Sequence, residues 1–275
     1  MSSIEYDPVK DKFAKIIRNS HLLRRLFYAL LDLFFLRSWH LRRLIKSYGN
    51  HYDKSGDWQL LDAGCGFGQY DRFILKQFSR VKVLSVDLKK DYLEDCRNYF
   101  SSEIEKGRIC FRQEDLLSPD LEESFDMAIC IDVLEHIEDD HRVIGNLFQV
   151  IKPGGFFIMH SPSHYSEEDA DDDDSFVGEH ARPGYSKNDI REKLETTGFR
   201  IVDLHYTYGF WGHKAWLLSV KYPMIWFNRA GLAAFLILIL YYPVVMPFCI
   251  LLNYADLHSK NRKGNGIYAV GQKPG

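Results

Sequence analysis

Between about residues 58 and 208, short apolar runs alternate with segments in which apolar residues recur at helical spacing. The segments between the runs, such as 71–79 and 141–151, have the pattern of amphipathic helices. The expected strands are QLLDAG at 59–64, VKVLSVD at 81–87, RICFRQED at 108–115, FDMAICID at 125–132, GGFFIMHS at 154–161 and FRIVDLHYTY at 199–208. Strands that alternate with helices predict an α/β fold built on a parallel, doubly wound sheet.

Turn and capping chemistry marks two boundaries in this region. The segment Lys152-Pro153-Gly154-Gly155 predicts a turn that ends the helix before the fifth strand. Ser186 and Asp189 have the spacing of a capping box, and Gly198 is a typical helix stop. Residues 187–197 are therefore expected to be helical.

Two further apolar segments lie outside the alternating region. Residues 230–252 carry no charged side chain, and about 20 apolar residues are enough to span a bilayer. Pro243 and Pro247 fall inside this run and are expected to break a straight helix. Near the amino terminus, LFYALLDLFFL at 26–36 lies among basic residues that, on one ideal helix, share an arc of roughly 120°. These residues are Arg18, Arg24, Arg25, Arg42, Arg43 and Lys46, whereas Asp32 falls inside the arc and Arg37 outside it.

Composition and charge narrow the class of protein. The chain has 275 residues, of which 46% are hydrophobic and 27% charged, which is typical of a globular protein. Its net charge is −3, but residues 1–46 hold ten Lys and Arg against four Asp and Glu, so the remainder carries −9. This uneven distribution argues against a uniformly basic nucleic-acid binder. Five scattered cysteines without a C-x-x-C pair, and a charged start without a signal peptide's apolar core, predict a cytoplasmic protein.

The segment LLDAGCGFG at 60–68 leads from an apolar strand into a helix. In a doubly wound sheet, the loop after the first strand faces the crevice in which ligands bind. Glycines in this loop allow a ligand to approach the backbone. Asp87 follows the second strand, nineteen residues after Gly68, where a carboxylate can accept hydrogen bonds from ribose hydroxyls. These features predict a nucleotide-type cofactor, and a nicotinamide-binding domain or a non-catalytic nucleotide-binding module would share them.

Across residues 56–208 the chain resembles the class I S-adenosylmethionine-dependent methyltransferases. The resemblance rests on five ordered motifs, DAGCGFG at 62–68, VDL at 86–88, EDL at 114–116, DVLEH at 132–136 and IKPGG at 151–155. The spacing G-x-G-x-G, rather than G-x-G-x-x-G, also favours the methyl donor over NAD. The resemblance implies an enzyme that uses S-adenosyl-L-methionine. It also implies a Rossmann-like seven-stranded sheet whose last strand, GIYAVGQK at 266–273, is antiparallel.

The resemblance also implies which residues form the cofactor crevice. They are Asp62, Gly64, Gly66, Gly68, Asp87, Leu88, Asp115, Leu116 and Asp132. The three glycines would pack against the methionine part of the cofactor. Asp87 would hold the ribose, and Asp115 with Leu116 would frame the adenine. The structural alternatives are that Asp115 caps a short helix and that Asp132 simply ends a strand.

Candidate catalytic residues lie on the loops after the fourth and fifth strands. They are His136, His180, Arg182 and Tyr185. A sulfonium methyl is already electrophilic, so the protein must align a nucleophile and, for a hydroxyl or acidic carbon, remove a proton. Histidine suits a general base, and arginine suits a carboxylate or phosphate on the substrate. The alternatives are that His180 and Arg182 only tie a loop down and that His136 only shapes the pocket.

Seven acidic residues within 167–174 predict a solvated loop. Charge without ordered geometry does not make a metal site, so no metal is assigned.

If GIYAVGQK is the last strand, residues 209–264 are an insertion whose two ends return to one sheet. A single membrane crossing is then excluded. We favour a broken helical hairpin that dips into one leaflet, together with a basic, apolar amino-terminal helix on an anionic bilayer. The expected division is a helical arm at 1–50, a methyltransferase core at 51–208, a hydrophobic helical insertion at 209–264 and the last strand of the core at 265–275.

This placement predicts methyl transfer to an apolar or membrane-associated acceptor, such as a lipid, quinone, carotenoid or lipid-linked sugar. The protein would then work in the cytoplasm, at the inner face of the membrane. One alternative is a cytosolic methyltransferase of a soluble small molecule or sugar, whose apolar segments form a cap or a homodimer interface. A cofactor-binding module without methyl transfer is the other alternative.

Overall fold

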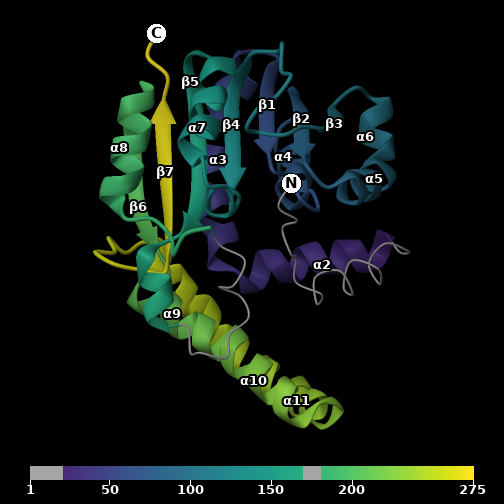
Figure 1. Ribbon diagram of the computed structural model, residues 1–275. Coiled ribbons are helices and arrows are strands. Elements are labelled where there is room, and N and C mark those ends of the chain that lie inside the picture. The colour runs from purple at the N-terminus through teal and green to yellow at the C-terminus, as the bar shows by residue number, and fades with distance from the viewer. Residues whose placement is uncertain (1–20, 170–180) are drawn as a thin grey trace.

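The computed structural model describes residues 21–169 and 181–275, which form one seven-stranded sheet with helices on both faces (Figure 1). The strands are β1 (Trp58–Ala63), β2 (Val81–Asp87), β3 (Ile109–Gln113), β4 (Phe125–Ile131), β5 (Ile151–Pro162), β6 (Arg200–Thr207) and β7 (Gly266–Gln272). Their order is β3-β2-β1-β4-β5-β7-β6, and β7 is antiparallel to both neighbours while the remaining pairs are parallel. The predicted Rossmann-like, doubly wound sheet with an antiparallel last strand is confirmed.

Two buried apolar clusters hold helices against the two faces of the sheet. On one face lie α3 (Leu36–Ser55), α4 (Gln69–Gln77) and α5 (Lys90–Tyr99), and on the other lie α7 (Asp140–Val150) and α8 (Lys187–Thr197). Shorter elements are α6 (Ser101–Glu105), the 3-10 turns η1 (Leu134–His136) and η2 (His164–Asp169), and α2 (His21–Phe34) lies outside these layers. Because both faces are covered, the central strands read as continuous apolar runs, which made them recognisable in the sequence.

The predicted helix at 187–197 is confirmed together with its cap. The Ser186 hydroxyl accepts a hydrogen bond from the backbone N–H of Asp189, and the Asp189 carboxylate accepts one from the N–H of Ser186. Gly198 ends the helix in the left-handed region, with φ of 111°.

The helix before the fifth strand ends at Val150, as predicted, but residues 152–155 do not form the predicted turn. β5 begins at Ile151, directly after α7 ends, and includes this segment. The register of β5 against β4 shifts there, from the pair Phe125 and Ile151 to the pair Met127 and Phe156. The extra residues therefore form an irregularity within the strand, in which Gly154 supplies a φ of 80°.

The amino-terminal segment is two helices rather than one, so the predicted single basic arc is wrong. α2 ends at Phe34, Phe35 is extended, and α3 leaves in a different direction (Figure 1). Arg24 points inward and is buried. α3 runs without interruption past residue 50 and packs in the core, while Arg18 lies outside the described residues. The division of the chain into an arm and a core at residue 50 stays a prediction.

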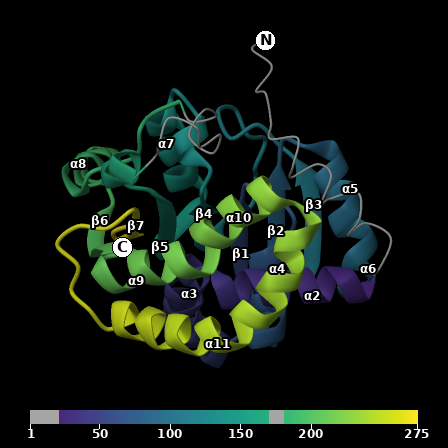
Figure 2. The same ribbon diagram turned by 90° about the horizontal axis from the view of Figure 1, so that it is seen from below.

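The insertion between β6 and β7 is a helical hairpin, as predicted. It contains α9 (Phe210–Trp216), a π-helical turn η3 (Leu217–Lys221), α10 (Tyr222–Ala230) and α11 (Leu232–Leu257). The prediction that Pro243 and Pro247 break the helix is wrong, because α11 continues through both. Residues four apart share one side of a helix, so the two missing N–H groups weaken the same side. α11 accordingly changes direction along its length in Figure 2.

A buried carboxylate fixes the base of this hairpin. Asp256 is fully buried and accepts a hydrogen bond of 3.1 Å from the backbone N–H of Gly212. Its other oxygen lies 3.2 Å from the Asn261 amide nitrogen and 3.4 Å from Nε2 of His40 on α3. Asp256 therefore joins α9, α11 and α3 at one point.

Candidate active site

The candidate site lies at the carboxyl ends of the parallel strands. After β1 the chain continues to β2 on one side, and after β4 it continues to β5 on the other side. Ligands bind in doubly wound sheets at such a switch point, which here lies between β1 and β4. α2 and the hairpin lie on this same side of the molecule (Figures 1 and 2).

The three glycines after β1 serve different purposes. All have positive φ, of 87° at Gly64, 52° at Gly66 and 72° at Gly68. A Cβ at Gly64 would lie 2.3 Å from Val133, and one at Gly68 would lie 2.8 Å from Phe100. A Cβ at Gly66 would meet no atom within 4 Å. Gly66 therefore faces open space, as a backbone approached by a ligand requires.

Asp87, at the end of β2, lies beside this open position. One carboxylate oxygen accepts a hydrogen bond of 2.9 Å from the N–H of Gly66, and the other accepts one of 2.9 Å from the N–H of Lys89. Leu88 is half exposed next to it. The predicted pairing of the glycine loop with Asp87 is present, and these residues fit a nucleoside with hydroxyl groups near Gly66.

Asp115 and Leu116 follow β3. The exposed Asp115 carboxylate accepts a hydrogen bond of 2.9 Å from the N–H of Leu117, so it closes a turn. The Leu116 side chain is buried, and its carbonyl accepts a hydrogen bond of 2.8 Å from the Asn146 amide. These contacts fix the loop after β3, and the role of both residues at an adenine ring stays a prediction.

Asp62 lies in the core rather than on an open surface. Burial, and then the neighbouring Asp71 carboxyl, raise the pKa of Asp62 well above its usual range. Burial also raises the pKa of Asp71 to about 7, and the Ser85 hydroxyl donates a hydrogen bond of 2.7 Å to this carboxyl. Two carboxyl groups buried together cannot both ionise easily, so this pair, on β1 and α4, keeps at least one proton and supports the crevice from the core.

Asp132, directly after β4, is held in an unusual backbone conformation by two partners. Its φ is 52°, and one carboxylate oxygen lies 2.6 Å from Nδ1 of His160 on β5. The other forms an ion pair with Arg37 of α3. Burial, followed by Arg37, lowers the pKa of His160 well below its ordinary value. The imidazole is therefore neutral and donates its Nδ1 hydrogen to Asp132.

Arg37 was not among the site residues predicted from the sequence. Its backbone N–H donates a hydrogen bond of 3.1 Å to the hydroxyl of Tyr208, after β6. Asp132 and Tyr208 are the two non-glycine residues with positive φ in the described part of the chain. Both contact Arg37, and strained backbone of this kind clusters at functional sites. No local pattern indicates this, because the partners of Arg37 are far away in the sequence.

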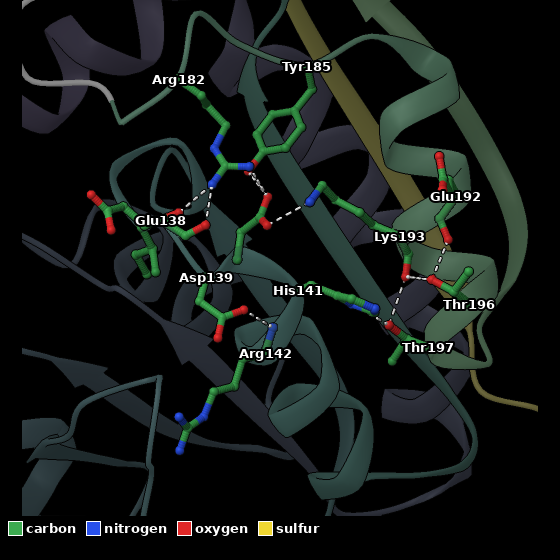
Figure 3. A network of polar contacts seen from close by, with 12 residues as sticks. Glu138, Asp139, His141, Arg142, Arg182, Tyr185, Glu192, Lys193, Thr196 and Thr197 are labelled. Carbon is green, nitrogen blue, oxygen red and sulfur yellow. Dashed lines mark hydrogen bonds and ion pairs between the residues drawn. The ribbon is translucent and has the colours of Figure 1, made fainter.

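Two of the four predicted catalytic residues are tied to a buried carboxylate (Figure 3). The Arg182 guanidinium donates to Asp140 over 2.6 Å and to the carbonyls of Ile137 and Glu138. The Tyr185 hydroxyl also donates to Asp140, and Lys193 donates to its other oxygen over 2.7 Å. For Arg182, these contacts agree with the alternative that it ties a loop down.

A polar hollow of about 490 Å³ lies beside this network, and none of its lining residues belongs to the glycine loop. His136 is half-buried in η1, close after β4, whereas His180 lies outside the described residues. A catalytic role for His136, His180, Arg182 or Tyr185 stays a prediction.

The strand order, the open glycine loop and the acidic residue at the end of β2 define a Rossmann-like cofactor-binding domain. Residues 61–157 match the protein family described as "Methyltransferase domain". The chain therefore carries a methyltransferase domain over these residues, and the cofactor of this domain is S-adenosylmethionine.

Known proteins resemble the chain in sequence or in fold. The ubiquinone biosynthesis O-methyltransferase of Rickettsia typhi is 31% identical over 159 residues, which cover 58% of this chain and 61% of that protein. The O-methyltransferase resE of Aspergillus sclerotiorum is 24% identical over 169 residues, or 58% of this chain and 62% of that protein. Each match thus covers less than two thirds of the relative. A methyltransferase structure from Clostridium acetobutylicum shares the fold, with a TM-score of 0.56 and 17% identity over 97% of this chain and 100% of that chain.

Proposed function

We propose that this chain transfers the methyl group of S-adenosylmethionine to an apolar small molecule that resides in a membrane. Methyl transfer is supported by the domain and by the fit of Gly66 and Asp87 to its cofactor. The apolar acceptor is supported by one observation, which is the exposed apolar hairpin on the side of the sheet where the glycine loop lies.

α11 presents its apolar side chains to the surroundings rather than to the core. Its segment Ile237–Leu257 is long and apolar enough to cross a membrane by length and composition. An 18-residue window of this segment has a mean hydropathy of 1.9, and only 17% of that window is buried. Leu240 is 76% exposed and Phe248 is 61% exposed. Soluble monomers rarely expose large contiguous apolar patches of this kind, which mark interaction sites.

The hairpin fits the headgroup region of a bilayer better than its centre. Both ends of residues 209–264 return to the sheet, at β6 and β7, so the hairpin enters and leaves on one side. Asn228 and the charged Arg229 are exposed at its tip, where deep insertion would be expensive. Exposed Trp211 and Trp226 suit the interface between lipid and water.

Charge supports an anionic leaflet as the partner. Residues 209–264 contain six Lys and Arg against one acidic residue, the buried Asp256. Basic residues that flank an apolar surface add electrostatic attraction to anionic lipids. All five cysteines are free thiols, which supports the cytoplasmic side of the membrane.

The proposed chemistry needs few residues of this chain. When bound, S-adenosylmethionine supplies an electrophilic methyl group on a sulfonium sulfur. The glycine loop and Asp87 would hold it, and Asp132, fixed by Arg37 and His160, faces the crevice from the end of β4. A relative named for ubiquinone biosynthesis supports an apolar acceptor for such a site.

The proposal is tested by offering the purified chain methyl-labelled cofactor and either the organic or the aqueous extract of lysed cells. Label should enter a product that partitions into the organic phase. Label that enters only aqueous products would contradict the apolar acceptor. Cofactor binding with no labelled product in either extract would favour a non-catalytic module.

A matched pair of variants connects this activity to the hairpin. Leu240→Gln combined with Phe248→Gln should abolish flotation with anionic vesicles and lower labelling of the organic phase at least tenfold. Val202→Gln, on the exposed part of β6, is the control and should change neither. Equal flotation of both variants would remove the hairpin from membrane binding.

A further inference from the structure

α2 has two faces of opposite character. Its outer face carries exposed leucines at helical spacing, which are Leu22, Leu26, Leu30 and Leu33. Leu22 is 74% exposed and Leu26 is 53% exposed. Arg24 and Tyr28 lie on the opposite side of the helix and are buried. A short helix that leaves so many leucines in water gains stability when these leucines are covered.

The inner face of α2 holds the glycine loop. The Tyr28 hydroxyl donates a hydrogen bond to the carbonyl of Phe67, and the Arg24 guanidinium donates to the same carbonyl over 3.0 Å. Arg24 also donates to the carbonyl of Asp95 over 2.8 Å. Phe67 lies between Gly66, which faces open space, and Gly68. Two side chains of α2 therefore fix the backbone of the loop at its centre.

α3, the helix that follows α2, reaches the other side of the crevice. The side chain of Gln69, just after the loop, donates to Asp32 of α2 over 3.0 Å and to Ser38 of α3 over 2.9 Å. Arg37 of α3 pairs with Asp132 after β4. The segment from α2 to the start of α3 therefore contacts the crevice both at the loop after β1 and at the residue after β4.

The outer face of α2 continues into the apolar surface of the hairpin. The ring of Phe34, at the end of α2, packs edge-on against Tyr242 of α11 with a centroid distance of 5.2 Å. Figure 2 shows α2 and α11 on the same side of the sheet. Residues 21–55 contain seven Lys and Arg against two Asp, whereas residues 56–208 contain 17 Lys and Arg against 32 acidic residues. Five of the seven basic residues in 21–55 lie on α3, and the hairpin beside α2 adds six more. An apolar helix flanked by these basic residues, next to an acidic body, fits an anionic bilayer.

We propose that α2 couples bilayer binding to cofactor binding, with its outer face on an anionic bilayer and its inner face on the glycine loop. This inference rests on the membrane contact of the proposed function. A bilayer that covers the leucines stabilises α2 in its place, and α2 in its place holds the loop ready for the cofactor. Coupling of this kind is reciprocal, so cofactor binding strengthens bilayer binding by the same factor.

The test measures the affinity of the full chain for S-adenosylhomocysteine by calorimetry, which requires no acceptor and no turnover. The dissociation constant should fall at least about fivefold when vesicles of phosphatidylcholine with phosphatidylglycerol are added, which is the lower end of typical coupling. Vesicles of phosphatidylcholine alone should have little effect. An unchanged or weaker affinity with vesicles that bind the chain would overturn the coupling while the proposed function stands.

Two sets of variants separate the faces of α2. Leu22→Gln with Leu26→Gln should leave the affinity without vesicles unchanged and remove the gain that vesicles give. Tyr28→Phe keeps the ring and loses the hydroxyl that bonds Phe67, so it should still bind vesicles but with a smaller gain. Tyr99→Phe is its control, because the Tyr99 ring packs on Tyr28 at 5.5 Å without a bond to the loop.

Two outcomes would overturn the proposal in other ways. Failure of the wild-type chain to float with anionic vesicles would remove the membrane contact and the coupling together. A dimer in sedimentation experiments that Leu22→Gln dissociates, with an affinity for S-adenosylhomocysteine that follows protein concentration rather than vesicles, would identify a second copy as the partner of the leucine face.

Discussion

Comparing Gly66→Ala with Gly107→Ala separates the backbone strain of the glycine loop from its role at the cofactor. Gly66 has φ of 52° and Gly107 has φ of 67°, and a Cβ at either would meet no atom within 4 Å. Alanine at either position therefore adds left-handed strain without a clash, at about 1–2 kcal/mol. Both variants should lose this amount of unfolding free energy, or a few degrees in Tm.

The two variants should differ in cofactor binding. Gly107 lies between α6 and β3, at the end of the sheet away from the crevice. Gly66 faces the space beside Asp87, so its added methyl occupies the path of the ligand. Gly66→Ala should raise the dissociation constant of S-adenosylhomocysteine at least tenfold, about 1.4 kcal/mol, while Gly107→Ala leaves it unchanged.

Calorimetric titration and urea unfolding of the two purified variants check this prediction. Equal affinities of both variants for S-adenosylhomocysteine would refute the placement of the cofactor at Gly66. Gly64→Ala provides a contrast, because its Cβ would lie 2.3 Å from Val133. It should lose clearly more stability than either of the other two.

Three further predictions concern the charged groups of the core. Asp256→Ala leaves the Gly212 N–H unsatisfied and should cost about 1–3 kcal/mol of unfolding free energy in urea, whereas a loss below about 0.5 kcal/mol would contradict its role at the hairpin base. Burial raises the pKa of Asp71 to about 7 in the folded chain. The stability that this protonated carboxyl gives the fold is therefore fully present below about pH 4 and is lost as the pH rises toward 7. Asp71→Asn should remove this loss, so its unfolding free energy relative to wild type should increase over that interval, and a constant difference would contradict the buried proton. Arg37→Ala removes a cation that lowers the pKa of His160, so NMR titration should show that this pKa moves upward. An unchanged pKa of His160 would contradict the electrostatic interaction between the two residues.

The strands of the core could be predicted because their environment is uniform. VKVLSVD coincides with β2, since a parallel strand covered on both faces needs apolar residues at nearly every position. GIYAVGQK as the last strand followed from the resemblance, and its antiparallel pairing with β5 and β6 is confirmed. By contrast, the prolines of α11 misled local reasoning, because tertiary contacts hold that helix. Tyr241 and Tyr242, just before Pro243, donate hydrogen bonds to carbonyls of η3 and fix α11 against its partner.

The misplaced arginines have a common cause. A helical projection sorts residues by angle, and it placed Arg24 on a solvent-facing basic arc and Arg37 outside it. The structure turns Arg24 onto the Phe67 carbonyl and Arg37 onto Asp132, both far away in the sequence. The guanidinium of Arg182, whose predicted catalytic role is untested, likewise donates to a residue far away in the sequence, Asp140 on α7. The pattern of a single segment contains no information about such partners, because it describes only the segment's own faces.

The distribution of charge connects the proposed orientation to the proposed chemistry. Residues 56–208 carry a formal charge of −15, whereas residues 21–55 and 209–264 carry +5 each. An anionic surface repels the acidic body and attracts the basic helices within roughly 10 Å, the screening length at about 0.1 M salt. α2 and the hairpin, which belong to these two segments, lie on the side of the sheet where the glycine loop opens. Electrostatics would therefore turn the crevice toward the lipid before any apolar side chain is inserted. An acceptor in the bilayer could then reach the crevice without crossing open water, and high salt should weaken this first step more than the apolar contact that follows.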